Sequence, residues 1–268
     1  MSTQNQPDWD TLAEKFDLWL PHIAPVGEAL LSALCFQPGD AILDVASGTG
    51  EPALTAAKRN PHCKFTGVDA AAGMVRAAQN KCREAHLDNL QFQTMAAENL
   101  QFPDNSFDTI ICRFGVMLFE DSQLGLKEMQ RVLKPDGRFA LAVWGRPEGF
   151  TTFNWSYQAF KGRIPEKDEP AIDKVTSLSA PGVLETLLNN AGFKDFTIEP
   201  QHFDYQFQSI YEYWNIVEKS DIMKQQFDAL PENERGNVRN EVARFAHDFQ
   251  TENGLVIPHE YILASGTK

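Results

Sequence analysis

The sequence Ala41-Ile-Leu-Asp-Val-Ala-Ser-Gly-Thr-Gly-Glu-Pro-Ala53 contains, in order, the signals of a strand, a tight turn and a helix. Its first five residues are apolar except for Asp44, which is typical of a strand buried in a sheet. The small residues Ala46 to Gly50 favour a tight turn, and Pro52 suits the first turn of a helix because its missing N–H costs nothing there. Backbone N–H groups gathered at such a helix start attract anionic or acceptor-rich ligand groups.

Two carboxylates indicate which ligand this turn would bind. Asp44 lies at the mouth of the turn, where it would repel a pyrophosphate but can receive an ammonium group, directly or through water. Asp69 ends the next strand, where its oxygens can accept both hydroxyls of a ribose. The ligand implied has a ribose and a cationic amino-acid end. The spacing Gly48-x-Gly50-x-x-Ala53 also satisfies the loose dinucleotide fingerprint, so a dinucleotide site and a turn without a ligand remain alternatives at this point.

Taken with the segments that follow, these residues resemble class I S-adenosylmethionine-dependent methyltransferases. Within them the chain is most similar to the ubiquinone/menaquinone C-methyltransferase-like group. The resemblance is dense between residues 40 and 145, loose elsewhere, and specific because five motifs occur in the family's order. Those motifs are Leu43–Gly50, in which Ala46 replaces a common glycine, then Gly67–Asp69, Glu98–Asp108, Cys112–Gly115 and Leu133–Arg138.

The resemblance implies S-adenosylmethionine as cofactor, S-adenosylhomocysteine as product, and no metal. It places Met74 under the adenine ring and leaves the Ala97 N–H for a ring nitrogen. Ala96 stands where the family has an acid that accepts the exocyclic amine of adenine, so Glu98 or a backbone carbonyl is left to take that role. The cofactor-binding residues expected are Asp44, Ala46, Gly48, Gly50, Asp69, Met74, Ala97, Glu98, Arg113 and Phe114.

Strands alternate with helices as far as Trp144, which predicts an α/β fold with a doubly wound, mostly parallel sheet. The resemblance implies the Rossmann-like methyltransferase version, with seven strands, an antiparallel last strand and a helical insertion. The predicted parts are N-terminal helices in residues 1–36, a candidate lid; a cofactor-binding core in 37–200; a helical insertion over the acceptor site in 201–254; and a closing strand in 255–268.

Composition limits the partners. The 268 residues carry a formal charge of −13 without a basic run or patch, which argues against a nucleic-acid substrate. Strand four ends in Cys112-Arg-Phe-Gly115 and not in the Asn/Asp-Pro-Pro-Tyr tetrapeptide of adenine N-methyltransferases, which argues in the same direction. The four cysteines lie far apart without a Cys-x-x-Cys pair, which argues against zinc or a disulfide framework.

Residues 1–7 are polar and lack a signal-peptide pattern, and no apolar run approaches the ~18 residues that span a bilayer. We therefore expect a cytoplasmic protein without membrane insertion.

The segments after Trp144 are rich in aromatic residues, which suggests an apolar or aromatic small-molecule acceptor. Methyl transfer from a sulfonium is an in-line displacement that requires alignment and a dry site, so either C- or O-methylation fits. Candidate bases are His22, His202 and Tyr205, and candidate pocket residues are Trp19, Tyr157, Tyr205 and Trp214. Two alternatives remain: a non-catalytic module that binds S-adenosylmethionine or S-adenosylhomocysteine, and an NAD-linked oxidoreductase.

Overall fold

The structure, a computed structural model, describes residues 8–268. Residues 1–7, whose polar sequence entered the prediction of localisation, lie outside the described residues. The strands are β1 (Ala41–Val45), β2 (Lys64–Asp69), β3 (Leu90–Thr94), β4 (Phe107–Arg113), β5 (Leu133–Trp144), β6 (Lys194–Phe207), β7 (Gln250–Thr251) and β8 (Gly254–Thr267). The α-helices are α1 (Trp9–Phe16), α2 (Leu20–Ser32), α3 (Ala53–Arg59), α4 (Ala72–Glu84), α5 (Ser122–Val132), α6 (Thr151–Phe160), α7 (Ile172–Val175), α8 (Val183–Ala191), α9 (Ile210–Lys219), α10 (Lys224–Ala229) and α11 (Arg235–Ala246).

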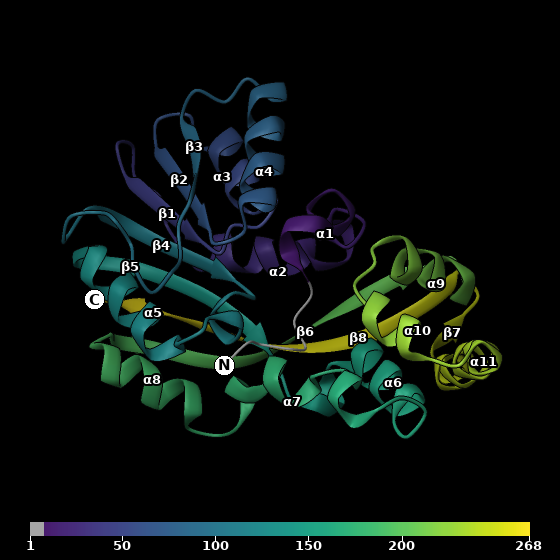
Figure 1. The fold of residues 1–268 in the computed structure, drawn as a ribbon. Helices are drawn as coiled ribbons and strands as arrows, with labels where there is room; N and C mark the ends of the chain where they lie inside the picture. The colour runs from purple at the N-terminus through teal and green to yellow at the C-terminus, as the bar shows by residue number, and fades with distance from the viewer. Residues whose placement is uncertain (1–7) are drawn as a thin grey trace.

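The strands form one sheet in the order β3-β2-β1-β4-β5-β8-β6, drawn from top to bottom in Figure 1. Strands β1 to β5 are parallel, and β8 runs antiparallel to both β5 and β6. The predicted fold class and the antiparallel last strand are therefore confirmed. A two-residue strand, β7, adds an eighth member by pairing with β8.

The sheet is wound in two directions from its centre. From β1 the chain moves outward through β2 to β3, and from β4 it moves the other way to β5. Because β-α-β crossovers are right-handed, opposite directions of travel place the connecting helices on opposite faces. Helices α3 and α4 thus cover one face, whereas α5 and α8 lie together on the other (Figure 1). The carboxyl ends of β1, β2 and β4 meet at one edge, where parallel α/β sheets bind ligands.

The β6–β8 pair extends well beyond this edge. Strand β8 pairs with β5 only from Arg138–Thr267 to Trp144–Tyr261, but its pairing with β6 continues to Phe207–Leu255. The alternating aromatics at the end of β6 therefore belong to the same strand, and the boundary predicted at residue 200 is wrong. We call this two-stranded extension, residues 202–207 and 255–260, the ribbon. Helices α6 and α9–α11 gather around it, as Figure 1 shows.

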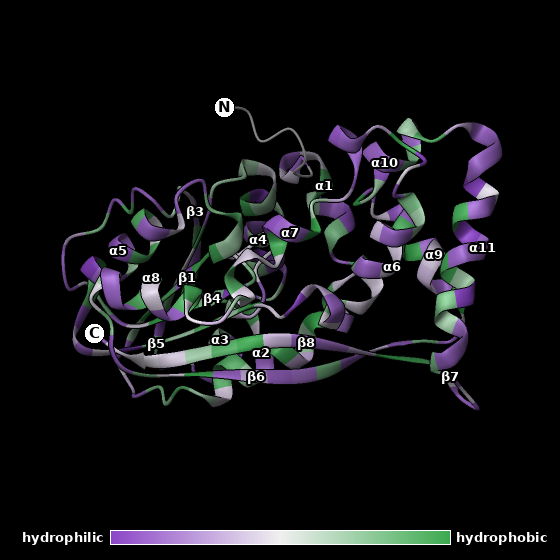
Figure 2. Ribbon diagram, turned by 90° about the horizontal axis from the view of Figure 1, so that it is seen from below, coloured by the Kyte–Doolittle hydropathy of each residue, from purple (hydrophilic) through white to green (hydrophobic). Residues whose placement is uncertain are grey.

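The helices beside the ribbon are amphipathic, and their apolar faces point inward. In α11 the residues Val238 and Val242 are fully buried, whereas most of the helix is hydrophilic (Figure 2). Helices α9 and α10 are separate, because Asp221 adopts a left-handed φ of +55° between them. Helix α8 begins directly after the left-handed Gly182.

No helix within residues 8–268 is long and apolar enough to cross a membrane. Over the same residues, no three His, Cys, Asp or Glu side chains are grouped in a way that could hold a metal ion.

Candidate active site

A cavity of about 1360 Å³ lies at the carboxyl edge of the sheet, beneath α1 and beside α6 and α9. This volume exceeds the roughly 300–1,000 Å³ of ordinary small-molecule sites, so the cavity has room for two ligands. Eight of the ten predicted cofactor residues line it, namely Ala46, Gly48, Asp69, Met74, Ala97, Glu98, Arg113 and Phe114. Asp44 and Gly50 are not among the described residues that do.

The backbone conformation of the turn after β1 explains why its residues are small and why residue 50 is glycine. Ala46 has a φ of +56° and Gly48 a φ of +53°, the left-handed region in which glycine is favoured. Gly50 has a φ of +109°, and a Cβ there would lie 2.7 Å from Leu54 Cδ1. Gly50 therefore lets α3 approach the turn, and its prediction as a cofactor contact is corrected to a packing role.

Asp69 holds this turn in place from the end of β2. One carboxylate oxygen accepts a hydrogen bond from the Gly48 N–H at 2.9 Å, and the other accepts one from the Ala71 N–H at 2.9 Å. Burial raises the pKa of Asp69, while these two N–H groups act against the rise. Asp69 lines the cavity as well, so one carboxylate both shapes the turn and faces the space beside it.

Asp44 lies beneath the turn, 1% exposed, and neither of its oxygens accepts a hydrogen bond from any residue in 8–268. Burial raises its pKa to about 8, although the Arg113 charge favours the ionised form. The backbone N–H of Ala53 also favours the ionised form. Because Asp44 does not line the cavity, the direct contact to an ammonium group is not available, and the route through water remains.

Arg113, at the end of β4, lines the cavity, and its charge acts on Asp44. Its guanidinium donates a hydrogen bond to the Glu51 carbonyl oxygen at 2.9 Å. Burial lowers the pKa of Arg113, and the nearby Asp44 and Glu51 carboxylates raise it. The site therefore contains a buried cation that faces an unsatisfied buried carboxylate.

On the opposite wall, the segment from Met95 to Glu98 lines the cavity. One oxygen of Glu98 accepts the backbone N–H groups of Glu120 at 2.7 Å and Asp121 at 3.2 Å. Glu98 thus fixes the loop that leads into α5, and only its second oxygen is left for a ligand. The Ala96 side chain lines the cavity without offering a polar atom.

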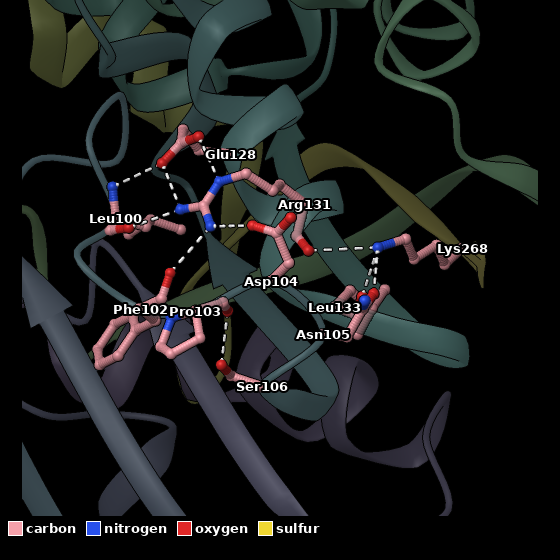
Figure 3. A network of polar contacts seen from close by, with 10 residues as sticks. All are labelled: Leu100, Phe102, Pro103, Asp104, Asn105, Ser106, Glu128, Arg131, Leu133 and Lys268. Atoms are coloured by element: carbon pink, nitrogen blue, oxygen red, sulfur yellow. Dashed lines mark hydrogen bonds and ion pairs between the residues drawn. The ribbon is translucent and has the colours of Figure 1, made fainter.

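The loop that follows this wall is clamped by Arg131 of α5 (Figure 3). Its guanidinium donates to the Leu100 carbonyl at 2.7 Å and the Phe102 carbonyl at 2.9 Å, and pairs with Asp104 at 2.6 Å. Glu128 completes the clamp, since it binds Arg131 and accepts the Leu100 N–H at 2.9 Å. The wall with Ala96 and Ala97 is therefore held to α5 by charge-assisted hydrogen bonds, the strong class of such contacts.

A ladder of stacked rings continues the cavity away from the turn. Phe114 stacks on Trp144 at 3.9 Å between ring centroids, Trp144 stacks on Phe150 at 3.9 Å, and Phe150 stacks on Phe153 at 5.0 Å. All four rings line the cavity. The ladder joins the motif after β4 to helix α6 and gives this end an apolar, aromatic wall.

The predicted acceptor residues divide into two groups. Trp19 and Tyr205 line the cavity, whereas Tyr157 and Trp214 are not among the described residues that do. Their neighbours in sequence, Ser156 and Tyr213, line it instead. One residue along a helix turns the side chain by about 100°, which carries Trp214 away to pack against Phe227.

The three predicted bases lie in different surroundings in the structure. His202 is exposed on β6, 3.8 Å from the Glu260 carboxylate and outside the cavity lining of the described residues. His22 is half-buried against Tyr205 and Phe207, and burial lowers its pKa. Tyr205 lines the cavity, and burial raises its pKa, so its phenol is neutral.

Sequence reasoning missed His259 on β8. It is 1% exposed, and its ring stacks on Tyr205 at 3.9 Å. Its Nε2 lies 2.9 Å from the Thr152 hydroxyl, which belongs to a cavity-lining residue. The alternation of Leu255, Ile257 and His259 marks the inward face of the strand, and this pattern was the available signal.

Helix α1 closes the cavity from above and is fixed at both ends. Asp10 accepts the Gly73 N–H of α4, and Asp17 pairs with Lys81 at 2.6 Å. Lys15 forms an ion pair with Asp221 between α9 and α10. Helix α1 therefore contacts both the sheet domain and the segment between α9 and α10.

We expect Gly73→Ala to loosen this lid. A Cβ at Gly73 would lie 2.2 Å from the backbone oxygen of Asp10, so α1 has to move. The cost should be about 1–3 kcal/mol in the free energy of unfolding. Gly236→Ala is the matched control, because Gly236 is also the second residue of its helix and has open space around its Cα. Urea denaturation showing equal stability for the two variants would contradict the contact.

Comparison with known proteins identifies related methyltransferases. The family model described as a methyltransferase domain matches residues 42–137. A ubiquinone/menaquinone biosynthesis C-methyltransferase of Geotalea daltonii is 33% identical over 163 residues, which are 58% of this chain and 68% of that protein. A demethylmenaquinone methyltransferase of Porphyromonas gingivalis is 38% identical over 111 residues, but the match spans 41% of this chain and only 45% of that relative.

Among solved structures, the YcgJ protein of Bacillus subtilis superimposes with a TM-score of 0.61 at 25% identity, over 92% of this chain and 99% of that one. The strand order, the turn after β1 and the match to a relative over two thirds of its length agree with one another. The chain belongs to the class I S-adenosylmethionine-dependent methyltransferases.

Proposed function

We propose that this methyltransferase transfers the methyl group of S-adenosylmethionine to a small apolar or aromatic acceptor, on carbon or oxygen. The observation that carries the proposal is the continuity of one cavity. It runs from the Asp69 carboxylate and the Gly48 turn to the ring ladder that starts at Phe114. A polar end and an aromatic end in one cavity suit a nucleoside cofactor and an apolar acceptor.

The cofactor would occupy the polar end. Asp69 would accept the ribose hydroxyls, and the Gly48–Gly50 turn would pack against the amino-acid end. The N–H groups of Gly48 and Gly50 are already donated to Asp69 and to the Ser47 carbonyl. Asp44 fits a cationic group reached through water, because its buried oxygens have no partner among residues 8–268. Met74 and Ala97 line the space where an adenine ring would lie.

When bound, this cofactor supplies an electrophilic methyl group on a sulfonium. The protein's contribution is alignment and exclusion of water. Helix α1 lines the cavity, and the stacked rings of Trp144 and Phe150 provide an apolar wall beside which an aromatic acceptor would lie. The relatives named for quinone biosynthesis support an aromatic acceptor, although their names describe those proteins.

The test is calorimetric titration with S-adenosylmethionine, followed by incubation with methyl-labelled cofactor and a panel of phenols and naphthols. Binding of S-adenosylmethionine with transfer of label to an aromatic compound is the expected result. Label transfer only to polar amines would exclude the apolar acceptor, and binding of NADH in its place would exclude the cofactor assignment.

We further expect Ala96→Asp to tighten cofactor binding about threefold to tenfold, because a hydrogen bond to a charged acceptor contributes roughly 1.5–3 kcal/mol before the cost of burying it. Ala96 lines the cavity next to Ala97 without a polar atom. Ala96→Ser is the control, since it adds a polar group without the charge. Equal or weaker binding of S-adenosylmethionine by the Asp variant would show that another group, such as the second oxygen of Glu98, already holds the amine.

A further inference from the structure

At the start of α6, His259 determines which groups of the cavity wall donate hydrogen bonds and which accept them. His259 Nδ1 lies 2.9 Å from the Ile257 carbonyl oxygen, which can only accept. Nδ1 must therefore carry the proton and donate it. In the neutral ring Nε2 is then an acceptor.

Two groups of Thr152 meet that acceptor. The Thr152 backbone N–H donates to Nε2 at 3.3 Å, and the Thr152 hydroxyl lies 2.9 Å from the same atom. A protonated Nε2 would face the N–H donor, so the backbone contact keeps the imidazole neutral. Burial acts in the same direction and lowers the pKa of His259 to about 3.

The Thr152 hydroxyl must then donate its proton to Nε2, which leaves its oxygen as an acceptor only. No residue within 8–268 is recorded as donating to this oxygen, and Thr152 lines the cavity. One turn along α6, the Ser156 hydroxyl donates to the Thr152 carbonyl at 3.2 Å, and Tyr213 approaches Ser156 at 3.3 Å. The hydroxyl protons of this patch are donated to protein acceptors, so the hydroxyl oxygens keep lone pairs that can accept.

We propose that Thr152, oriented by His259, is a specificity-determining subsite that accepts a hydrogen bond from a hydroxyl group on the aromatic acceptor. The hydroxyl would sit against Thr152 while its ring packs on the neighbouring wall of Phe150 and Phe153. A phenol can donate a hydrogen bond to the Thr152 oxygen while its ring packs on the aromatic wall. Its methyl ether has no proton to donate and would place one acceptor oxygen against another. This inference rests on the proposed function, because it assigns a chemical class to the same acceptor.

The test uses the full chain saturated with S-adenosylhomocysteine, and two probes, 2-naphthol and 2-methoxynaphthalene, measured by equilibrium dialysis. Wild type should bind 2-naphthol about threefold to tenfold more tightly, as expected for one net hydrogen bond. Thr152→Val should reduce the preference to about onefold, and Thr152→Ser should retain it. The Val variant keeps the backbone N–H on His259, so the histidine does not lose its partner.

Several results would overturn the subsite. They are no preference in wild type, no binding of 2-naphthol, or a preference retained by the Val variant. Nitrogen-15 NMR of the His259 ring should show a protonated Nδ1 and a bare Nε2, and the opposite tautomer would contradict the orientation of Thr152. Failure of S-adenosylhomocysteine to bind wild type would instead contradict the proposed function, so the two failures are distinguishable.

Discussion

Asp69→Ala should weaken binding of S-adenosylmethionine by about one to two orders of magnitude. A charge-assisted hydrogen bond contributes roughly 1.5–3 kcal/mol, and tenfold in affinity is about 1.4 kcal/mol. The structure adds a second cause, because the same carboxylate accepts the N–H groups of Gly48 and Ala71. Removing the carboxylate releases the turn and also removes the contact to the ribose.

Glu232→Ala is the matched control, since it removes one exposed carboxylate from the short helical turn before α11. Titration calorimetry should show wild-type affinity for this variant. Unchanged affinity in Asp69→Ala would remove Asp69 from the cofactor site. A loss confined to stability, with wild-type affinity at low temperature, would restrict Asp69 to shaping the turn.

The second large effect is expected at Asp44, whose folded pKa of about 8 exceeds the ordinary value of 3.8. Between these two values the folded chain keeps a proton that the unfolded chain has lost. The free energy of unfolding of the cofactor-free protein should therefore fall as pH rises, by about 1.4 kcal/mol per unit. From pH 6.5 to 8 the loss from this group is about 2 kcal/mol.

Asp44→Asn should abolish that part of the pH dependence. The lowered pKa values of His22 and His259 stabilise the fold as pH rises toward 6.5 and add little above it. Urea denaturation at pH 6.5 and 8 should thus show a stability difference between variant and wild type that grows by about 2 kcal/mol. A constant difference would mean that Asp44 is ionised throughout this range.

The same group should link cofactor binding to pH. If a cationic ligand requires ionised Asp44, affinity in wild type should rise about tenfold from pH 6.5 to 8, with release of a proton on binding. Asp44→Asn should bind more weakly and show a flatter profile. Calorimetry in buffers of different ionisation enthalpy measures the released proton directly.

The parts of the fold that were predictable depend on short stretches of chain. The turn around Gly48 and the carboxylate Asp69 follow from local patterns, because strand, turn and helix signals lie within about a dozen residues. Ala46 was identified as unusual, and its φ of +56° gives the reason. Asp44 and Gly50 were expected at the cofactor but are not among the described residues that line the cavity, because Asp44 is buried beneath the turn and Gly50 packs against Leu54 of α3.

The acceptor end could not be predicted residue by residue. Which face of α6 or α9 turns inward depends on how the helix docks, and in α9 it is Tyr213, the neighbour of Trp214, that lines the cavity. The pairing of His259 with Thr152 joins residues 107 positions apart. They come together only because β8 runs back along β6, and no local sequence pattern predicts the register of that pairing.

The ribbon has a consequence for how such an enzyme can diversify. Its two strands carry their helices beyond the sheet, and the family match at residues 42–137 ends before β6 begins. Changes in loop length or helix packing at the far end of the ribbon leave the β1 turn and the β2 carboxylate untouched. Exchange of the ribbon and its helices would thus change the range of acceptors while the proposed cofactor site stays the same. Chimeric proteins joined within β6 and β8 would keep the part of the chain that forms the proposed cofactor site.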